Sequence, residues 1–145
     1  MPRLLLLLTM LGAAPAALAG QFLSVGDNAA IMYDAPSLKA NKLFVASKLY
    51  PLELIVQVDA WIKVRDAAGD LAWVEKKTLS DLRTVVVTAE LADVRQKPED
   101  AAPVAFQARR GVALEIAELV AGPWAKVRHR DGQTSFVRST QVWGW

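Results

Sequence analysis

One segment of fourteen residues occurs twice in this chain, and this repetition constrains the fold more than any other feature of the sequence. The first copy covers 61–74 and the second covers 124–137, and the two align without a gap. Both copies keep Trp, Lys, Val, Arg, Gly, an aromatic residue and Val at corresponding places. Each alternates apolar and polar residues, turns at a polar segment that contains Gly, and alternates again. This pattern predicts a β-hairpin.

The segments before each hairpin also correspond, mostly at a spacing of 62 residues. The expected strands are 21–25, 30–33, 42–46 and 52–58 before the first hairpin, and 84–88, 92–95, 104–108 and 114–116 before the second. Because the hairpins themselves lie 63 residues apart, one residue is inserted near Gly122 and Pro123, in a loop that can accept it. We expect no helix, five or six short strands in each copy, and an all-β fold.

The N-terminus has the three parts of a secretory signal peptide. A basic start is followed by the apolar run 4–11, and the small residues after it end in Ala17-Leu18-Ala19. The apolar run is too short to cross a bilayer, which takes about 20 residues. We expect residues 1–19 to be removed and the protein to be periplasmic or secreted, touching the membrane only through the signal peptide before cleavage. A buried N-terminal helix is the alternative.

The remaining chain divides into two expected domains, 20–82 and 83–145. The segment between the hairpin of the first and the first strand of the second, 76–83, is short and charged and contains no flexible Gly/Pro/Ser tract. We therefore expect the two domains to be closely packed, each covering apolar surface that the other cannot bury. The final residues Trp143 and Trp145 are expected to pin the last strand, or to offer a terminus to a partner.

Composition excludes several classes of function. The net charge of +2 is too small for the basic surface that nucleic-acid binding requires. The chain has no Cys, so it is neither a disulfide scaffold nor the usual kind of bacterial lipoprotein. His129 is the single His, and no ligands are clustered for a metal. We expect no cofactor, no catalytic residues and no enzyme activity, because a lone His without a partner Ser or Cys makes no triad.

The quoted residues resemble a known family. The run Ala92-Asp93-Val94-Arg95 with Pro98, the Leu-Glu-Leu/Ile segments and the repeated hairpin resemble the bacterial SH3-like domain over essentially the whole mature chain. The closing Val142-Trp143-Gly144-Trp145 is similar to the end of exported tandem SH3-like proteins of Gram-negative bacteria. The resemblance implies two tandem SH3-like barrels. It also implies binding of peptidoglycan or of a peptide, because better-known relatives target cell-wall enzymes to peptidoglycan or hold peptides.

The chain departs from the family pattern at a few places. The family usually has Gly before the second hairpin aromatic, where this chain has Ala72 and Ser135. The segment 93–95 of the second domain, Asp-Val-Arg, is replaced by Ile-Met-Tyr at 31–33 in the first. If Arg95 supports a ligand site, the first domain lacks its counterpart, and the two domains need not bind alike.

Alternation along the hairpins predicts which residues face outward. With Ile62 and Val64 in the barrel, an aromatic and basic stripe lies outside, and Lys63 faces Trp73 as Lys126 faces Phe136. If the turns are symmetric, this placement makes cation–π contacts of about 0.5–1 kcal/mol possible. Tyr33 and Tyr50 flank turns and either line a groove or pack the barrel end. The ligand-binding candidates are Tyr33, Tyr50, Trp61, Lys63, Trp73, Arg95, Trp124, Lys126 and Phe136.

Two functions fit these features. The first is a non-enzymatic binding module that takes peptidoglycan or an extended peptide on the outer aromatic and basic faces. The second is a structural or assembly protein of the cell envelope, whose aromatics form the contact between the domains or with another protein. An aromatic on a small barrel often serves only as a lid over its own core.

Overall fold

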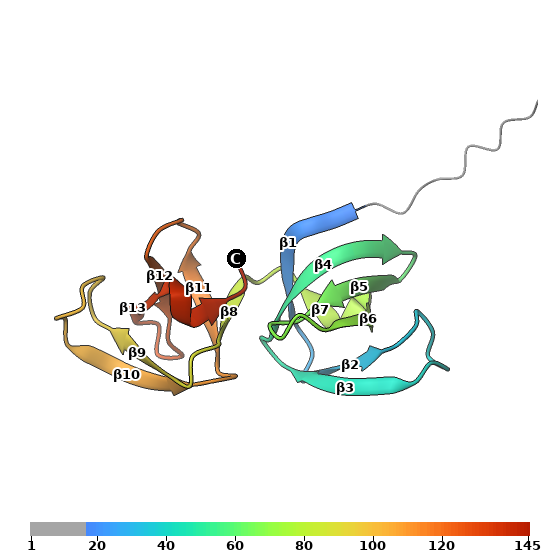
Figure 1. Ribbon diagram of the computed structural model, residues 1–145, viewed down its shortest axis with the longest axis horizontal. Coiled ribbons are helices and arrows are strands. Elements are labelled where there is room, and N and C mark those ends of the chain that lie inside the picture. Colours follow the sequence, from blue (N-terminus) through green and yellow to red (C-terminus); the bar gives the residue numbers. More distant parts are fainter. Residues whose placement is uncertain (1–16) are drawn as a thin grey trace, which may run out of the picture.

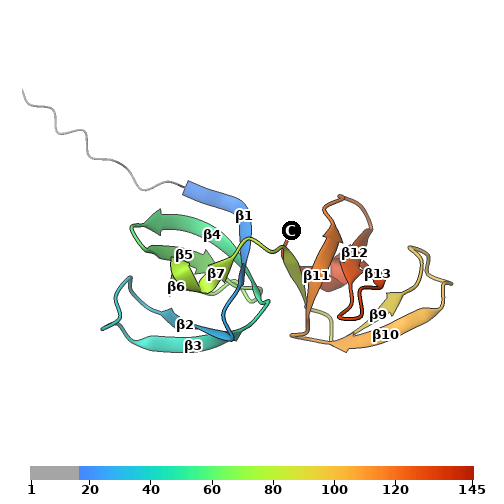
Figure 2. The ribbon, with the colours of Figure 1, turned by 180° about the vertical axis from the view of Figure 1, so that it is seen from behind.

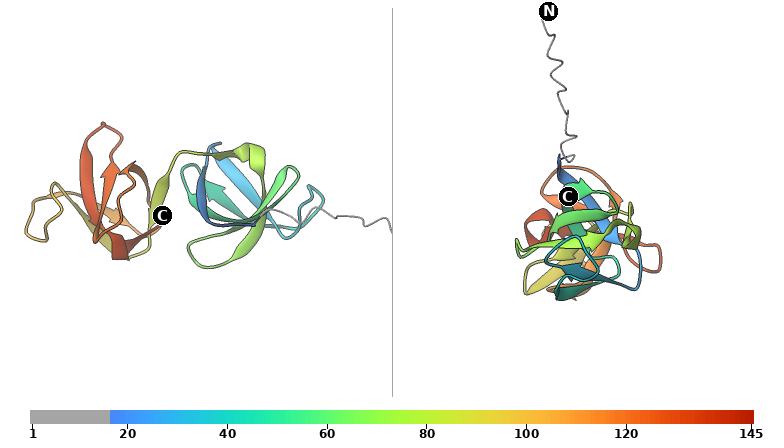
Figure 3. Two further views of the ribbon diagram at one scale, coloured as in Figure 1. Left: turned by 90° about the horizontal axis from the view of Figure 1, so that it is seen from above. Right: turned by 90° about the vertical axis from the view of Figure 1, so that its right-hand side faces the viewer.

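Two small barrels joined by one extended segment make up the described part of the chain, residues 17–145, in the computed structural model. The barrels lie one after the other along the long axis of the molecule (Figures 1 and 3). The expected signal peptide, residues 1–19, lies outside the described residues except for the backbone of its last three. No helix in the described part is long and apolar enough to cross a membrane.

Each barrel contains seven strands, and each has one 3₁₀ turn of three residues before its last strand. The strands of the first barrel are β1 (Ala17–Val25), β2 (Ala29–Tyr33), β3 (Lys42–Ser47), β4 (Pro51–Val58), β5 (Trp61–Arg65), β6 (Leu71–Glu75) and β7 (Leu79–Ser80). Those of the second are β8 (Thr84–Val87), β9 (Leu91–Arg95), β10 (Val104–Arg109), β11 (Ala113–Glu118), β12 (Trp124–Arg128), β13 (Thr134–Arg138) and β14 (Val142–Trp143). The 3₁₀ turns are η1 (Lys76–Thr78) and η2 (Ser139–Gln141).

The two sheets have the same topology. The strand order is β3-β2-β6-β5-β4-β1-β7 in the first and β10-β9-β13-β12-β11-β8-β14 in the second, so each strand corresponds to the one seven places later. All of the pairings are antiparallel, and no strand is exchanged between the sheets. The prediction that one β module occurs twice with the same fold is therefore confirmed.

The structure corrects the expected number of strands and the expected linker. Each barrel has seven strands rather than five or six, because a two-residue strand closes each sheet: β7 pairs with β1, and β14 with β8. Residues 76–80, expected to belong to the linker, thus form part of the first barrel. The connection that remains is the short segment 81–83.

Strand β1 begins within the expected signal peptide but hardly depends on it. Of the five residue pairs that join β1 to β4, only Ala17 with Val56 involves a residue before Gly20. The other four begin at Gln21, and both pairs with β7 lie later still. Cleavage before Gly20 would therefore leave the closure of this barrel nearly intact.

Alternating residues of the hairpins fill the barrel cores, as predicted. Ile62, Val64, Ala72 and Val74 are buried in the first barrel, and Ala125, Val127, Ser135 and Val137 in the second. Ala72 and Ser135, which replace the glycine usual in the family, are thus core residues. Each barrel has its own cluster of buried apolar residues, and neither cluster includes residues of the other barrel.

A β-bulge lies at the same place in both barrels. The register shifts between Leu54 and Val56 in β4, and between Ile116 and Glu118 in β11. The turn that follows β4 has two residues, 59–60, whereas the loop that follows β11 has five, 119–123. This longer loop contains Gly122 and Pro123, where the sequence predicted the inserted residue.

The C-terminus of the chain lies between the two barrels (Figure 2), and aromatic side chains from both barrels meet nearby. The ring of Phe22 in the first barrel lies edge-to-face with that of Trp143 in the second, at 5.1 Å between centroids, and the Arg83 guanidinium lies 5.4 Å from the Phe22 ring centroid. The Thr84 hydroxyl donates a hydrogen bond of 2.6 Å to the Leu49 carbonyl. The predicted contact between the domains exists, but each barrel completes its own core without it.

Both terminal tryptophans hold the end of the chain, as expected. Trp143 lies in β14, paired with Val86, and Trp145 packs against the core of the second barrel. Arg83, beside this contact, donates a hydrogen bond of 3.2 Å to the Gly144 carbonyl, and burial lowers its pKa. The closing segment therefore stabilises both the second barrel and its contact with the first.

Candidate functional site

The outer face of the first barrel carries three candidate residues in one row across three strands. Trp73 of β6 pairs with Lys63 of β5 on one side and with Tyr33 of β2 on the other. Trp73 and Lys63 are half-buried, whereas Tyr33 is only 4% exposed. The part of this row that a ligand can reach is therefore Trp73 with Lys63.

The second barrel has the corresponding row with a different chemistry. Phe136 of β13 pairs with Lys126 of β12 and with Arg95 of β9. All three side chains are half-buried. Lys126 forms an ion pair with Glu118 at 3.5 Å. The predicted pairing of Lys63 with Trp73 and of Lys126 with Phe136 is thus confirmed, although the ionic surroundings of the two lysines differ.

The cation–π contacts that this placement made possible for the two lysines are not formed. The two cation–π contacts among residues 17–145 are those of Arg83 with Phe22 and of Arg138 with Trp124. Strand register placed each lysine beside an aromatic ring, but the rotamer decides where the ammonium group goes. In the second barrel Lys126 turns toward the Glu118 carboxylate instead.

The tryptophan that opens each hairpin, Trp61 or Trp124, is in contact with a neighbour, and the neighbour differs between the barrels. In the first, the Trp61 ring meets the Tyr33 ring edge-to-face at 5.3 Å between centroids. In the second, the Arg138 guanidinium lies 4.4 Å from the centroid of the Trp124 ring. Trp61 and Trp124 thus each have a neighbour on part of the ring, although all four aromatic side chains, including Trp73 and Phe136, are half-buried.

Arg138 is itself held by a carboxylate. Its guanidinium donates two hydrogen bonds to the two carboxylate oxygens of Asp100, the one from Nε at 3.1 Å. Asp100 lies in the loop between β9 and β10, so this pair ties the loop to β13. The hydrogen bonds from Arg138 lower the pKa of Asp100 below its ordinary value.

Arg95 supports the same loop from inside. Its guanidinium donates a hydrogen bond of 2.8 Å to the Ala102 carbonyl and lies 3.4 Å from the Asp93 carboxylate. Asp93 in turn accepts a hydrogen bond of 2.8 Å from the Gln107 side chain. In this structure Arg95 positions the loop that flanks the outer face of the second barrel.

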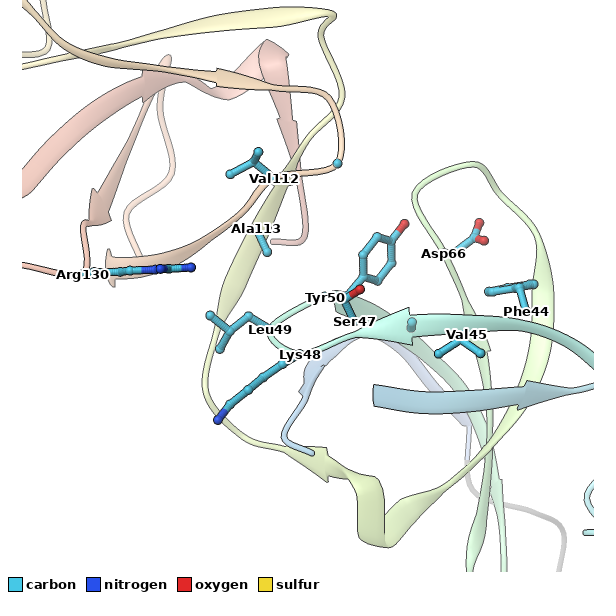
Figure 4. A pocket seen from close by; sticks show the side chains of 12 residues that line it. Phe44, Val45, Ser47, Lys48, Leu49, Tyr50, Asp66, Val112, Ala113 and Arg130 are labelled. Atoms are coloured by element: carbon cyan, nitrogen blue, oxygen red, sulfur yellow. The ribbon is translucent and has the colours of Figure 1, made fainter. Parts of the chain in front are cut away.

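A concave surface lies between the barrels, apart from the two outer faces, and the sequence did not indicate it. It consists of two adjoining hollows of about 550 and 580 Å³ that share the residues Leu49, Val112, Ala113 and Arg130. We call the two hollows together the interbarrel groove. Figure 4 shows the first hollow, where Arg130 extends from the second barrel toward Leu49 of the first.

Tyr50, which was predicted either to line a groove or to pack the barrel end, lines this groove. Its hydroxyl accepts a hydrogen bond of 3.3 Å from the Ala67 amide. Burial raises the pKa of Tyr50, and the nearby Asp66 carboxylate acts in the same direction, against the Ala67 hydrogen bond. Asp66 is buried and accepts hydrogen bonds from the amides of Ala68 and Asp70 at 3.0 and 2.9 Å. The hydroxyl is therefore neutral and able to donate a hydrogen bond into the groove.

The second hollow is the repeat counterpart of the first. Phe106 corresponds to Phe44 and His129 to Asp66 in the repeat. Phe44 and Asp66 line the first hollow, and Phe106 and His129 line the second. The His129 ring lies 4.9 Å from the Phe106 ring, and its Nδ1 lies 3.4 Å from the Asp131 carboxylate. The two hollows are thus lined by corresponding residues of the two repeats. They form one groove because the two barrels lie next to each other.

No group of three or more His, Asp or Glu side chains within the described residues is arranged to hold a metal ion. The acidic side chains of the groove are bound to backbone amides or to arginine: Asp66 as above, and Glu115 with Arg128 at 2.8 Å. What the site offers chemically is aromatic surface, hydrogen-bond donors and cationic groups.

The family follows from a comparison with models of known protein families. The model described as "Bacterial SH3 domain" matches twice, over residues 26–81 and 88–144, and the two matches cover each barrel except for its first strand, β1 or β8. The chain belongs to this family. It is a tandem bacterial SH3 domain protein, as its sequence pattern predicted. No curated protein matches the chain.

Solved structures give weaker similarities. NlpC2 of Trichomonas vaginalis is 12% identical, with 90% of this chain and 50% of that one covered and a TM-score of 0.40. NlpC1 of the same organism is 14% identical, with 93% and 50% covered and a TM-score of 0.38. An NlpC/P60 family protein of Bacillus cereus is 14% identical, with 85% and 56% covered and a TM-score of 0.40. The chain spans about half the length of these proteins.

Proposed function

We propose that this tandem bacterial SH3 domain protein is an exported, non-enzymatic binding module of the cell envelope, which holds peptidoglycan or an extended peptide on the outer faces of its barrels. The observation that carries the proposal is the aligned pair of an aromatic and a lysine on each outer face, Trp73 with Lys63 and Phe136 with Lys126. These half-buried rings offer flat apolar surface, and the lysines offer charge for carboxylates. The lysine of the first barrel has no ion pair among the described residues, so we expect this barrel to bind anionic groups more strongly.

Co-sedimentation with purified sacculi tests the proposal. Replacing Trp73 by Ala and Phe136 by Ala should each weaken retention, and the double replacement should abolish it, because aromatic anchors commonly contribute 2 kcal/mol or more, which is roughly 30-fold in affinity. The matched control is Leu119→Ala, since Leu119 is an exposed apolar residue in the loop 119–123, outside both outer rows. Equal retention of all variants, or no retention of the native protein, would refute the proposal.

The alternative, a structural or assembly protein, is favoured by one observation. Phe22 and Trp143 already form an aromatic contact between the barrels. In that case the outer aromatics would serve as lids. Replacing Trp73 by Ala would then cost about 3 kcal/mol or more in the free energy of unfolding, as expected for a core aromatic. A smaller loss of stability combined with a loss of sacculus binding favours the binding module.

A further inference from the structure

Each sheet has a six-residue strand at one end of its strand order, β3 or β10, and a two-residue strand at the other end, β7 or β14. Strand β3 pairs only with β2, and β10 pairs only with β9, so in the described part of the chain the other edge of each strand has no partner. Both strands have six residues and lie along the same side of the molecule (Figure 1). A free edge presents backbone N–H and C=O groups that can pair with an added strand.

The interbarrel groove runs along these free edges. Consecutive residues 44–50 line the first hollow, and consecutive residues 106–109 line the second. Successive side chains of a strand point to opposite faces, so an uninterrupted run of lining residues means that the strand edge itself borders the hollow. At about 3.3 Å per residue, the four strand residues that border each hollow, 44–47 and 106–109, give roughly 13 Å for pairing.

The charge that remains available in the groove is positive. The carboxylates of Asp66 and Glu115 are already bound, as described above. Lys48, Arg109 and Arg130 line the groove with exposed side chains, and none of them forms an ion pair with another described residue. A ligand that follows these edges would therefore meet cations whose charge no carboxylate of this chain neutralises.

The outward side chains of β3 add apolar surface. Leu43 and Val45 alternate along the strand with the inward Phe44 and Ala46, and they are 49% and 62% exposed. Large exposed apolar side chains on an edge strand favour its association with another chain, which would cover them. An added strand with apolar residues on one face and carboxylates on the other matches both the exposed aliphatic groups and the cations.

We propose that the interbarrel groove binds an extended acidic segment of a partner protein, which adds a strand to the free edge of β3 and places its carboxylates near Lys48 and Arg130. Backbone pairing along the regular edge 44–47, continued by contacts to Lys48 and Arg130, suits an extended polypeptide segment better than the short peptides of the cell wall. This site is separate from the outer faces, so it does not depend on the function proposed above.

Fluorescence anisotropy tests the proposal with a labelled eight-residue peptide of alternating Val and Glu, and with its Val and Lys counterpart as the control. The acidic peptide should bind and the basic one should not. Arg130→Gln and Lys48→Gln should each weaken binding roughly two- to five-fold, and the double variant up to about 25-fold, from exposed pairs of up to about 1 kcal/mol. The matched controls are Arg110→Gln and Lys39→Gln, which change exposed cations outside the groove.

Three further measurements decide between the outcomes. The acidic peptide with N-methyl groups on alternate backbone amides should not bind, and the intact peptide should protect β3 amides from hydrogen exchange. The Trp73→Ala and Phe136→Ala double variant should bind the peptide normally, which separates this site from the outer faces. The proposal is overturned if the methylated or the basic peptide binds equally well, or if the groove variants bind like their controls. Displacement of the peptide by soluble muropeptides at lower concentration would assign the groove to the cell wall and also overturn it.

Discussion

Replacing Gly144 by Ala tests a close approach of the chain both to its own barrel, at Thr84 of β8, and to the first barrel, at Pro51 of β4. The backbone at this residue has φ +138°, which L side chains rarely adopt. A Cβ there would lie 2.6 Å from the Thr84 carbonyl oxygen and 3.0 Å from the Pro51 Cβ. Neither neighbour is the end of a flexible side chain, so the strand β14 or the first barrel itself must shift.

The expected loss in the free energy of unfolding of Gly144→Ala has two parts. A residue held in a region of φ and ψ that only glycine favours costs on the order of 1–3 kcal/mol. Overpacking against a rigid neighbour costs about 1–3 kcal/mol more. Gly122→Ala is the matched control, because Gly122 has a similar φ of +153° but no atom within 4 Å of the added Cβ. The difference between the two variants therefore measures the overpacking alone.

The assay is thermal unfolding followed by far-ultraviolet circular dichroism. For a barrel of this size, 1 kcal/mol corresponds to roughly 4–8 °C in Tm. We expect Gly144→Ala to melt at least about 4 °C below Gly122→Ala. If the two variants melt together, the close packing of Gly144 against Thr84 and Pro51 does not contribute to stability, and this reasoning is refuted.

Three further outcomes are expected from thermal melts. Thr84→Val should cost about 1 kcal/mol, because the Leu49 carbonyl loses its hydrogen bond, and Thr84→Ser should restore most of it. Asp66→Ala should cost about 1–3 kcal/mol by removing the acceptor of two turn amides, and Asp66→Asn less. The pKa of Asp100 is lowered in the folded state, so its contribution is present above the ordinary carboxyl pKa and is lost as pH falls through the lowered value. Asp100→Asn should therefore melt slightly below the native protein at pH 7, and the two should melt together near pH 2.

The periodicity of the sequence was sufficient to predict the hairpins and their cores. In the segment around Ile62 and Val64, alternation assigned every residue to the correct face, because a half-buried strand has a period of two. It could not reveal β7 or β14, since two residues are too few to show any period. Those strands form only because the chain after each 3₁₀ turn returns to the first strand of its own barrel.

The candidate sites were harder to predict for a related reason. Strand register correctly placed Lys126 beside Phe136. The flexible lysine side chain instead forms an ion pair with the Glu118 carboxylate, a partner that strand register does not predict. The interbarrel groove could not be predicted at all. Arg130 lies in a polar turn that looks merely solvated in the sequence, and it acquires neighbours only when the two barrels are placed together.

Trp61 and Trp124 occupy corresponding positions in the two copies, but the side chains that contact them differ in how they respond to salt and pH. Trp61 is held by another ring, a contact that neither ionic strength nor acid alters. Trp124 is contacted by the Arg138 guanidinium, which in turn forms an ion pair with the exposed Asp100 carboxylate. Added salt or protonation of Asp100 weakens this ion pair. The contact over Trp61 is therefore insensitive to salt and acid, whereas the corresponding contact over Trp124 depends on both.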